Sequence, residues 1–149
     1  MADIIFDVDG TLMDITHRRH FVAQRPKDFD SFRSHTEFDT RKEDIFAIAD
    51  ALQAQGHRIL ISTGRNKSQR DITIQQIRDG GIDFEQIYMR SDSDYTPDDE
   101  LKSRFLDRMI DDGYNPTMAF DDRQRVVDMF RSRGLTAVSY THLTLPTKA

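Results

Sequence analysis

The chain has 149 residues, of which 37% are hydrophobic and 32% charged, and its formal net charge at pH 7 is −5. This composition indicates one globular domain, and the acidic balance argues against general binding to duplex nucleic acid, although a few well-placed cations could hold one phosphate or strand end. The sequence contains no cysteine, which excludes disulfides, thiolate zinc sites and cysteine nucleophiles. No signal peptide or long apolar run is evident, which predicts a soluble, cytoplasmic protein without a membrane segment.

Short apolar runs alternate with amphipathic stretches along most of the chain. Strands are expected at 3–8, 58–62, 86–89, 117–120 and 135–138. Helices are expected between these runs, the first of them beginning where Thr40 and Glu43 have the spacing of a capping box. Strands that alternate with helices predict a parallel sheet with helices on both faces, a three-layer α/β fold of the Rossmann type.

Two stretches do not fit this alternation. Residues 14–39 are polar and irregular and are longer than an ordinary loop, which predicts a flap or a small cap insertion with short helices of its own. Residues 139–149 contain no acid and suit no further element, so we expect a tail that is not native. The predicted domain therefore covers 1–138.

Polar residues follow four of the expected strands, and ligands of open parallel sheets bind beyond the carboxyl ends of the strands. These candidates are Asp7 and Asp9 at the end of the first strand, Thr63, Gly64 and Arg65 after the second, Arg90 after the third, and Asp121, Asp122 and Arg123 after the fourth, with Lys102 near the start of the helix after the third strand.

Each residue type has a chemical use at such a site. Clustered carboxylates repel one another unless a cation joins them, and Mg²⁺ is the usual cation for hard oxygen ligands. Asp7 and Asp9 lie two residues apart, so on an extended chain they would face the same way, one to attack phosphorus and the other to handle a proton. The Thr63 hydroxyl and the Lys102 ammonium suit the oxygens of a transferring phosphoryl group, and Gly64 lets backbone amides approach it.

Each signal alone also has a plainer interpretation. The acids around Gly10 could form a turn or a calcium loop, although an EF-hand is excluded because Arg18 stands where the closing glutamate would be. Asp121 and Asp122 could cap the last helix, and Lys102 could be a solvated lysine. The conjunction of four signals in order, each close to an expected strand end, favours phosphoryl chemistry.

Taken together, these positions resemble the haloacid dehalogenase (HAD) superfamily of phosphotransferases. The matching residues are Asp7, Asp9 and Thr11, then Thr63, then Lys102, then Asp121 with Asp122. The resemblance implies that Asp7 is the nucleophile and that Asp9 protonates the leaving alcohol and later activates water. It also implies a Mg²⁺ ion held by Asp7, the backbone carbonyl of Asp9, Asp121 and Asp122.

A closer similarity is to the 3′-phosphatase domain of phage-type polynucleotide kinase/phosphatase. It rests on the strings ISTGR (61–65), DDELK (98–102) and AFDDRQRVVDMFRSRGL (119–135), and HRRHF (17–21) is similar to small phage and bacterial relatives. The similarity implies that Arg65 and Arg123 accompany the phosphate. Arg18, Arg19 and Arg90 are either ordinary loop or strand-end residues or contacts to the substrate. No P-loop is present, so a 5′-kinase half is not expected.

Three functions compete at this point. The first is removal of 3′-phosphates from DNA or RNA ends, beside a separate kinase or ligase, and the second is hydrolysis of small nucleotides or sugar phosphates. The third, a phospho-receiver module, is disfavoured because a receiver carries its phosphoacceptor at the end of the third strand, where this chain has Met89 and Arg90. The choice of substrate and the oligomeric state stay open.

Overall fold

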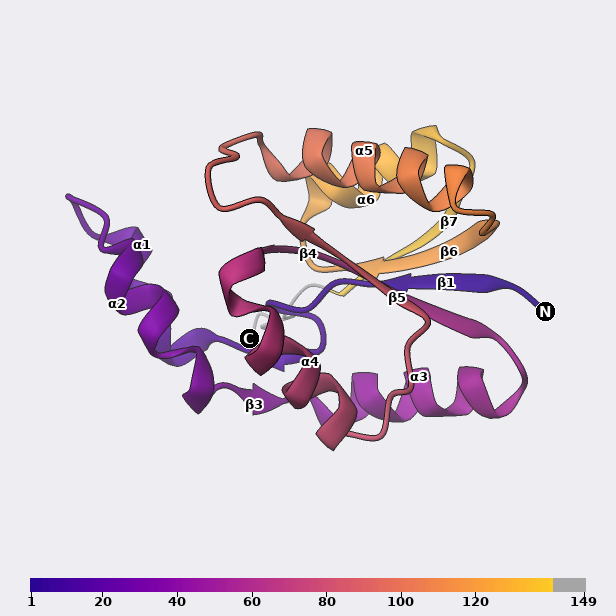
Figure 1. Cartoon of the computed structure of the whole chain (residues 1–149), viewed down its shortest axis with the longest axis horizontal. Helices are drawn as coiled ribbons and strands as arrows, with labels where there is room; N and C mark the ends of the chain where they lie inside the picture. The colour runs from indigo at the N-terminus through magenta and orange to yellow at the C-terminus, as the bar shows by residue number, and fades with distance from the viewer. Residues whose placement is uncertain (141–149) are drawn as a thin grey trace, which may run out of the picture.

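The main element of the computed structural model, which describes residues 1–140, is a five-stranded parallel sheet (Figure 1). The strand order is β5–β4–β1–β6–β7. The strands are β1 (Asp3–Phe6), β4 (Arg58–Asn66), β5 (Gln86–Arg90), β6 (Pro116–Asp121) and β7 (Thr136–Ser139). The central strand β1 is buried throughout and pairs in parallel with both β4 and β6, so its carboxyl end lies between theirs.

Helices cover both faces of this sheet (Figure 1). On one face lie α3 (Glu43–Ala54) and α4 (Arg70–Asp79), and on the other lie α5 (Asp98–Asp111) and α6 (Gln124–Ser132). Alternate residues of β1 supply the two cores, because Ile4 and Phe6 pack on the α3 side while Ile5 packs on the α5 side. The predicted three-layer α/β fold is confirmed.

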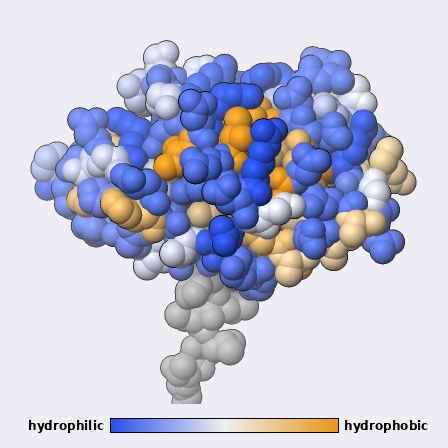
Figure 2. Space-filling model, turned by 60° about the horizontal axis from the view of Figure 1, so that its bottom comes forward, coloured by the Kyte–Doolittle hydropathy of each residue, from blue (hydrophilic) through white to orange (hydrophobic). Residues whose placement is uncertain are grey.

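Few large hydrophobic side chains are exposed among the described residues. The face shown in Figure 2 is largely hydrophilic, with a small group of hydrophobic residues near its centre. Among the described residues, no helix combines the length and the apolar character that crossing a bilayer requires.

Three local predictions were wrong. β1 ends at Phe6 rather than at residue 8, because the chain turns at Val8, whose carbonyl oxygen accepts three successive backbone N–H groups. The capping box is absent, since Thr40 pairs with Asp14 between β2 (Met13–Asp14) and β3 (Thr40–Arg41), and Lys42 precedes α3. β4 runs on to residue 66, so Thr63 to Arg65 lie within the strand, at a register shift against β5.

Residues 14–39 contain only short elements. These are η1 (Thr16–Arg18), α1 (His20–Ala23), α2 (Phe29–Ser34) and η2 (Thr36–Phe38), and the β2–β3 pair closes their base. Figure 1 shows α1 and α2 projecting beyond the end of the sheet that lies opposite the N-terminus. Whether this segment acts as a flap stays a prediction.

The first two residues of the expected tail, Ser139 and Tyr140, belong to the folded domain. Ser139 is the last residue of β7, and the Tyr140 N–H donates to the Asp121 carbonyl oxygen at 2.9 Å. The rest of the predicted tail, 141–149, lies outside the described residues.

Candidate active site

A cavity of about 1000 Å³ brings most of the predicted site residues together. Its lining includes Asp7, Asp9, Arg19, Gly64, Arg65, Arg90, Lys102, Asp122 and Arg123. Three other predicted residues, Arg18, Thr63 and Asp121, are buried and do not line it. The strand-end argument therefore selected residues that gather at one cavity, but it did not separate residues that line the cavity from residues behind it.

Three carboxylates and one ammonium meet at this cavity, which Asp7, Lys102 and Asp122 line while Asp121 is buried behind them. Oxygens of Asp7, Asp121 and Asp122 lie within 4.8 Å of one another. The first two meet because β1 and β6 pair in register, and the Asp7 N–H continues that ladder by donating to the Phe120 carbonyl oxygen at 3.0 Å. Lys102 Nζ, from the first turns of α5, donates to Asp7 Oδ1 at 2.8 Å and to Asp121 Oδ2 at 2.7 Å. We call these four residues the acidic cluster.

The acidic cluster is electrostatically incomplete. Burial raises the pKa of Asp7 well above its ordinary value, and the charge of Asp121 raises it further against the opposing effect of Lys102. Burial likewise raises the pKa of Asp122. Three carboxylates face one ammonium, so a hard divalent cation with oxygen ligands fits this donor set in both charge and chemistry.

Neighbouring groups hold the acidic cluster in place. The Thr11 hydroxyl donates to Asp7 Oδ2 at 3.0 Å, so each oxygen of that carboxylate has a partner. Gly10 has a φ of +84°, and a Cβ atom there would lie 2.0 Å from Asp122 Oδ2. Only glycine fits this turn without displacing the Asp122 carboxylate.

Asp9 belongs to a second group of charges. Its Oδ1 accepts from Arg65 Nε at 2.8 Å and from Arg18 Nη2 at 3.1 Å, and both arginines also bind Asp39 at 2.8 Å. His17 Nε2 lies 2.7 Å from Asp39 Oδ1. Burial raises the pKa of Asp9, but Arg65 and Arg18 outweigh it, and the net pKa is below the ordinary value. We call Asp9, Arg18, Arg65 and Asp39 the arginine network.

This arrangement corrects what we expected of Arg18 and Arg65. Arg18 is not a solvated loop residue: its side chain is 1% exposed, and its guanidinium carbon lies 4.3 Å from the centroid of the Phe32 ring. Arg65 also donates through Nη1 to Thr73 and Gln76 of α4, at 3.0 and 2.7 Å. Because their donors are taken by protein acceptors, these arginines are better placed to hold Asp9 than to bind phosphate or substrate.

Thr63 and Gly64 lie beside the cavity on β4. Thr63 is buried, and its Oγ1 accepts the Arg65 backbone N–H at 3.0 Å, which leaves its own hydroxyl proton available. A Cβ atom at Gly64 would lie 3.1 Å from Asp98 Oδ1, so glycine permits the close approach of α5.

The remaining predicted cations differ in exposure. Arg90 is mostly buried and donates to the carbonyl oxygens of Gly64, Asp94 and Thr96, so it holds the loop that follows β5 and is not a free contact for substrate. Arg19 and Arg123 line the cavity and are 51% and 64% exposed at the side chain, with Asp122 and Asp98 as their acidic partners at 3.6 and 3.4 Å.

Sequence reasoning missed two acids of the site. The Asp39 side chain is fully buried between Arg18 and Arg65, and nothing in its local sequence signals this role. Asp98 lines the cavity and pairs with both Arg90 and Arg123. It lies four residues before Lys102, on the same face of α5, and that helical spacing could have identified it.

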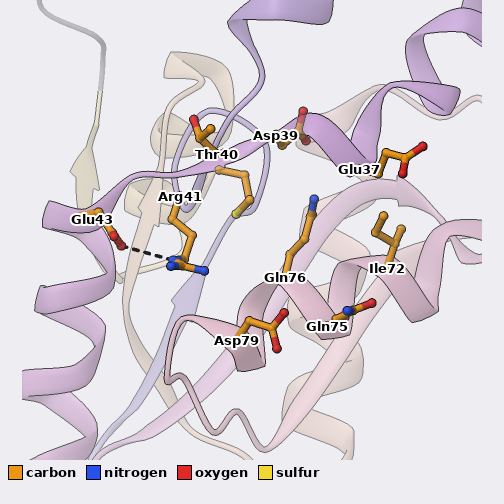
Figure 3. A pocket seen from close by; sticks show the side chains of 10 residues that line it. Glu37, Asp39, Thr40, Arg41, Glu43, Ile72, Gln75, Gln76 and Asp79 are labelled. Atoms are coloured by element: carbon orange, nitrogen blue, oxygen red, sulfur yellow. Dashed lines mark hydrogen bonds and ion pairs between the residues drawn. The ribbon is translucent and has the colours of Figure 1, made fainter.

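A second cavity, of about 630 Å³, is chemically different (Figure 3). It lies between β3 and α4, and four acids, Glu37, Asp39, Glu43 and Asp79, contribute to its lining. Its one cation, Arg41, is paired with Glu43 at 3.3 Å. This lining would repel a phosphate, so the candidate site for phosphoryl chemistry is the larger cavity.

Comparison with known proteins agrees with this geometry. A family model described as the polynucleotide kinase PNKP phosphatase domain matches residues 2–142. A chain of the Pnkp1/Rnl/Hen1 RNA repair complex has a similar structure, with 24% identity and a TM-score of 0.79 over 97% of this chain and 44% of that chain. The protein described here thus spans less than half the length of that relative.

Two further structures are similar at lower identity. A haloacid dehalogenase-like hydrolase from Streptococcus pneumoniae matches with 15% identity and a TM-score of 0.65, over 93% of this chain and 84% of that chain. A class C acid phosphatase from Bacillus anthracis, with tungstate bound, matches with 15% identity and a TM-score of 0.65, over 97% and 68%. These likenesses establish the HAD-like fold. Since the family model extends over nearly the whole chain, the chain belongs to the family of polynucleotide kinase PNKP phosphatase domains.

Proposed function

We propose that this protein is a Mg²⁺-dependent phosphomonoesterase that removes 3′-phosphates from nucleic-acid ends through an aspartyl-phosphate on Asp7. The observation that carries the proposal is the acidic cluster, in which Asp7 lies buried against Lys102 at 2.8 Å and within reach of Asp121 and Asp122. Membership of the PNKP phosphatase domain family supports the same chemistry.

In the first step, a carboxylate oxygen of Asp7 attacks phosphorus and the bond between phosphorus and the 3′-oxygen breaks. Asp9 delivers a proton to that oxygen, so the leaving group departs as an alcohol. The Lys102 ammonium and the Thr63 hydroxyl stabilise the charge of the transferring phosphoryl group. Mg²⁺, held by Asp7, the Asp9 carbonyl oxygen, Asp121 and Asp122, would neutralise negative charge on the acids and the phosphate.

In the second step, water attacks the phosphorus of the aspartyl-phosphate, Asp9 accepts a proton from that water, and Asp7 is restored as inorganic phosphate leaves. Arg18 and Arg65 keep Asp9 ionised in the free protein, which is the form that activates water. A phosphate that enters beside Asp9 raises its proton affinity, which prepares it for the first step.

Two observations support a nucleic-acid end as the substrate. Arg19 and Arg123 line the cavity and are exposed, so they can contact the phosphates of a strand. A similar structure belongs to an RNA repair complex, which fits a protein that works beside a separate kinase or ligase.

The second candidate, a phosphatase of small nucleotides or sugar phosphates, is favoured by the net charge of −5.

The test is phosphate release in the presence of Mg²⁺. The substrates are an oligonucleotide with a 3′-phosphate, the same oligonucleotide with a 5′-phosphate, a nucleoside 3′-monophosphate and a panel of sugar phosphates. We expect the highest kcat/KM with the 3′-phosphorylated oligonucleotide and little release from its 5′ counterpart. A higher kcat/KM with a sugar phosphate would favour the second candidate, and no release from any substrate would refute the proposal.

A further inference from the structure

Tyr95 is a large aromatic side chain that lines the proposed active-site cavity and yet is 89% exposed. It lies in the loop between β5 and α5. Among residues 1–140, no group hydrogen-bonds to its hydroxyl and no other ring packs on it. An aromatic ring exposed to this extent at a ligand cavity has a face available for a partner.

Hydrogen bonds nevertheless fix the backbone of the loop that carries Tyr95. Arg90 Nη1 donates to the carbonyl oxygens on either side of the tyrosine, those of Asp94 at 3.1 Å and Thr96 at 2.6 Å. Asp94 Oδ1 accepts the N–H and the hydroxyl of Thr96, at 2.9 and 2.6 Å. The backbone on both sides of Tyr95 is thereby fixed, so less conformational entropy is lost when a ligand binds to the ring.

A second exposed aromatic lines the same cavity from the segment 14–39. Phe29, at the start of α2, is 49% exposed. Phe32, one turn later, is only partly exposed and has the Arg18 guanidinium 4.3 Å from its ring centroid, whereas the nearest cation to the Phe29 ring, Lys27 Nζ, is 5.9 Å away. Of the aromatics that line this cavity, Tyr95 and Phe29 are thus the two most exposed.

We propose that Tyr95 is a stacking platform for the nucleobase next to the 3′-phosphate, with Phe29 as a second aromatic contact. The proposal rests on the proposed function, since a phosphate at Asp7 directs the attached nucleoside along the cavity. A planar base offers a π-face to an aromatic ring irrespective of its identity, so the contact accepts any sequence.

The experiment removes the ring and the base in turn. The substrates are a 3′-phosphorylated oligonucleotide and the same oligonucleotide with an abasic last nucleotide. The proteins are the wild type, Tyr95→Ala, Tyr95→Phe, and Phe38→Ala as a matched control. Phe38 is 62% exposed, lies on the same segment as Phe29 and does not line this cavity.

We expect Tyr95→Ala to raise KM for the base-containing substrate by about 5- to 100-fold, the loss expected for one base–aromatic stack, with a smaller change in kcat. The increase should shrink to less than about twofold on the abasic substrate, because the partner of the ring is already missing. Tyr95→Phe should keep most of the wild-type KM, and Phe38→Ala should match the wild type.

Several results would overturn the inference. An equal KM increase on both substrates would show that Tyr95 does not contact the base, and an equal loss in Tyr95→Phe and Tyr95→Ala would assign the effect to the hydroxyl. If the wild type releases 3′-phosphate and Tyr95→Ala behaves like it, the inference fails while the proposed function stands. If the wild type releases no phosphate from either oligonucleotide, both fail.

Discussion

The acidic cluster and the arginine network lie side by side at the end of the sheet, and each consists of four charged side chains, three of them buried and one, Asp122 or Asp9, partly exposed. The acidic cluster contains three carboxylates and one ammonium, and the only further cation paired with it among the described residues is the half-exposed Arg19, 3.6 Å from Asp122 Oδ2, so the carboxylates outnumber the cations. The arginine network contains two carboxylates and two guanidinium groups and is balanced within itself. Neighbouring acids, Asp7 and Asp9, therefore have opposite pKa shifts, the first raised and the second lowered.

This difference indicates what each region does. A buried cluster with unbalanced charge costs stability, and it persists where an added ion or substrate supplies the missing charge. A balanced network has no such need, and its hydrogen bonds orient the groups within it. We therefore assign binding and chemistry to the acidic cluster and the positioning of Asp9 to the arginine network. Four predictions test this assignment.

The largest expected effect is on turnover in Asp7→Asn. The amide cannot attack phosphorus, so kcat for a 3′-phosphorylated oligonucleotide should fall by about 10³-fold or more. Urea unfolding should show a stability no lower than that of the wild type in the absence of Mg²⁺, because one of three repelling charges is gone. Turnover within tenfold of the wild type would contradict the covalent mechanism.

Next in size is the loss of stability in Asp39→Asn. The change leaves Arg18 and Arg65 buried with one carboxylate instead of two, which should lower the free energy of unfolding by about 3 kcal/mol. Asp30→Asn is the matched control, since that side chain is 97% exposed in the same segment. Urea denaturation measures both, and equal stabilities would show that Asp39 does not anchor the network.

A smaller effect is expected in the pH dependence of stability without metal. Asp7 and Asp122 have folded pKa values raised above the ordinary 3.8. Their protonation therefore adds to the free energy of unfolding, fully below pH 3.8, and this stabilisation is lost as pH rises through the raised values. Asp9 has a lowered pKa, so its contribution is present above pH 3.8 and is lost as pH falls through the lowered value.

The melting temperature in EDTA should therefore decrease as pH rises above about 4, and saturating Mg²⁺ should reduce that decrease by neutralising the acidic cluster. Thermal melts across a pH series, with EDTA and with Mg²⁺, measure this difference. Identical curves would indicate that Mg²⁺ does not bind to the folded protein, and phosphate release in EDTA equal to that in Mg²⁺ would rule out the proposed metal dependence.

The smallest effect has the opposite sign to that of Asp39→Asn. Replacing Asp122, whose side chain is 18% exposed, with asparagine should leave the metal-free protein as stable as the wild type or about 1 kcal/mol more stable, because it relieves repulsion within the acidic cluster. The same variant should lose the stabilisation by Mg²⁺. A loss of several kcal/mol in metal-free buffer would show that Asp122 has a structural role that the charge balance misses.

Much of the fold could be predicted because its signals are local. The apolar runs that became β1, β4, β5, β6 and β7 are separated by helical stretches, and the right-handed crossover rule turns that order into a parallel sheet. The strand ends then placed Asp7 and Asp121 together. The local signals failed at Thr40, whose spacing with Glu43 suggested a helix cap, because pairing with Asp14 across the β2–β3 ladder took precedence.

The amino-acid sequence by itself thus determined the order of the elements, the acids at their ends and the family resemblance, since these depend on residue type and short-range spacing. Only the tertiary structure decided which charges balance one another. Arg18 meets Asp39 and Arg65 meets Asp9 because segments far apart in the chain converge at the end of the sheet. The tertiary structure also decided that Arg90 holds a loop whose tyrosine remains exposed. Such pairings depend on distances between side chains in the folded protein, which residue type and spacing do not specify.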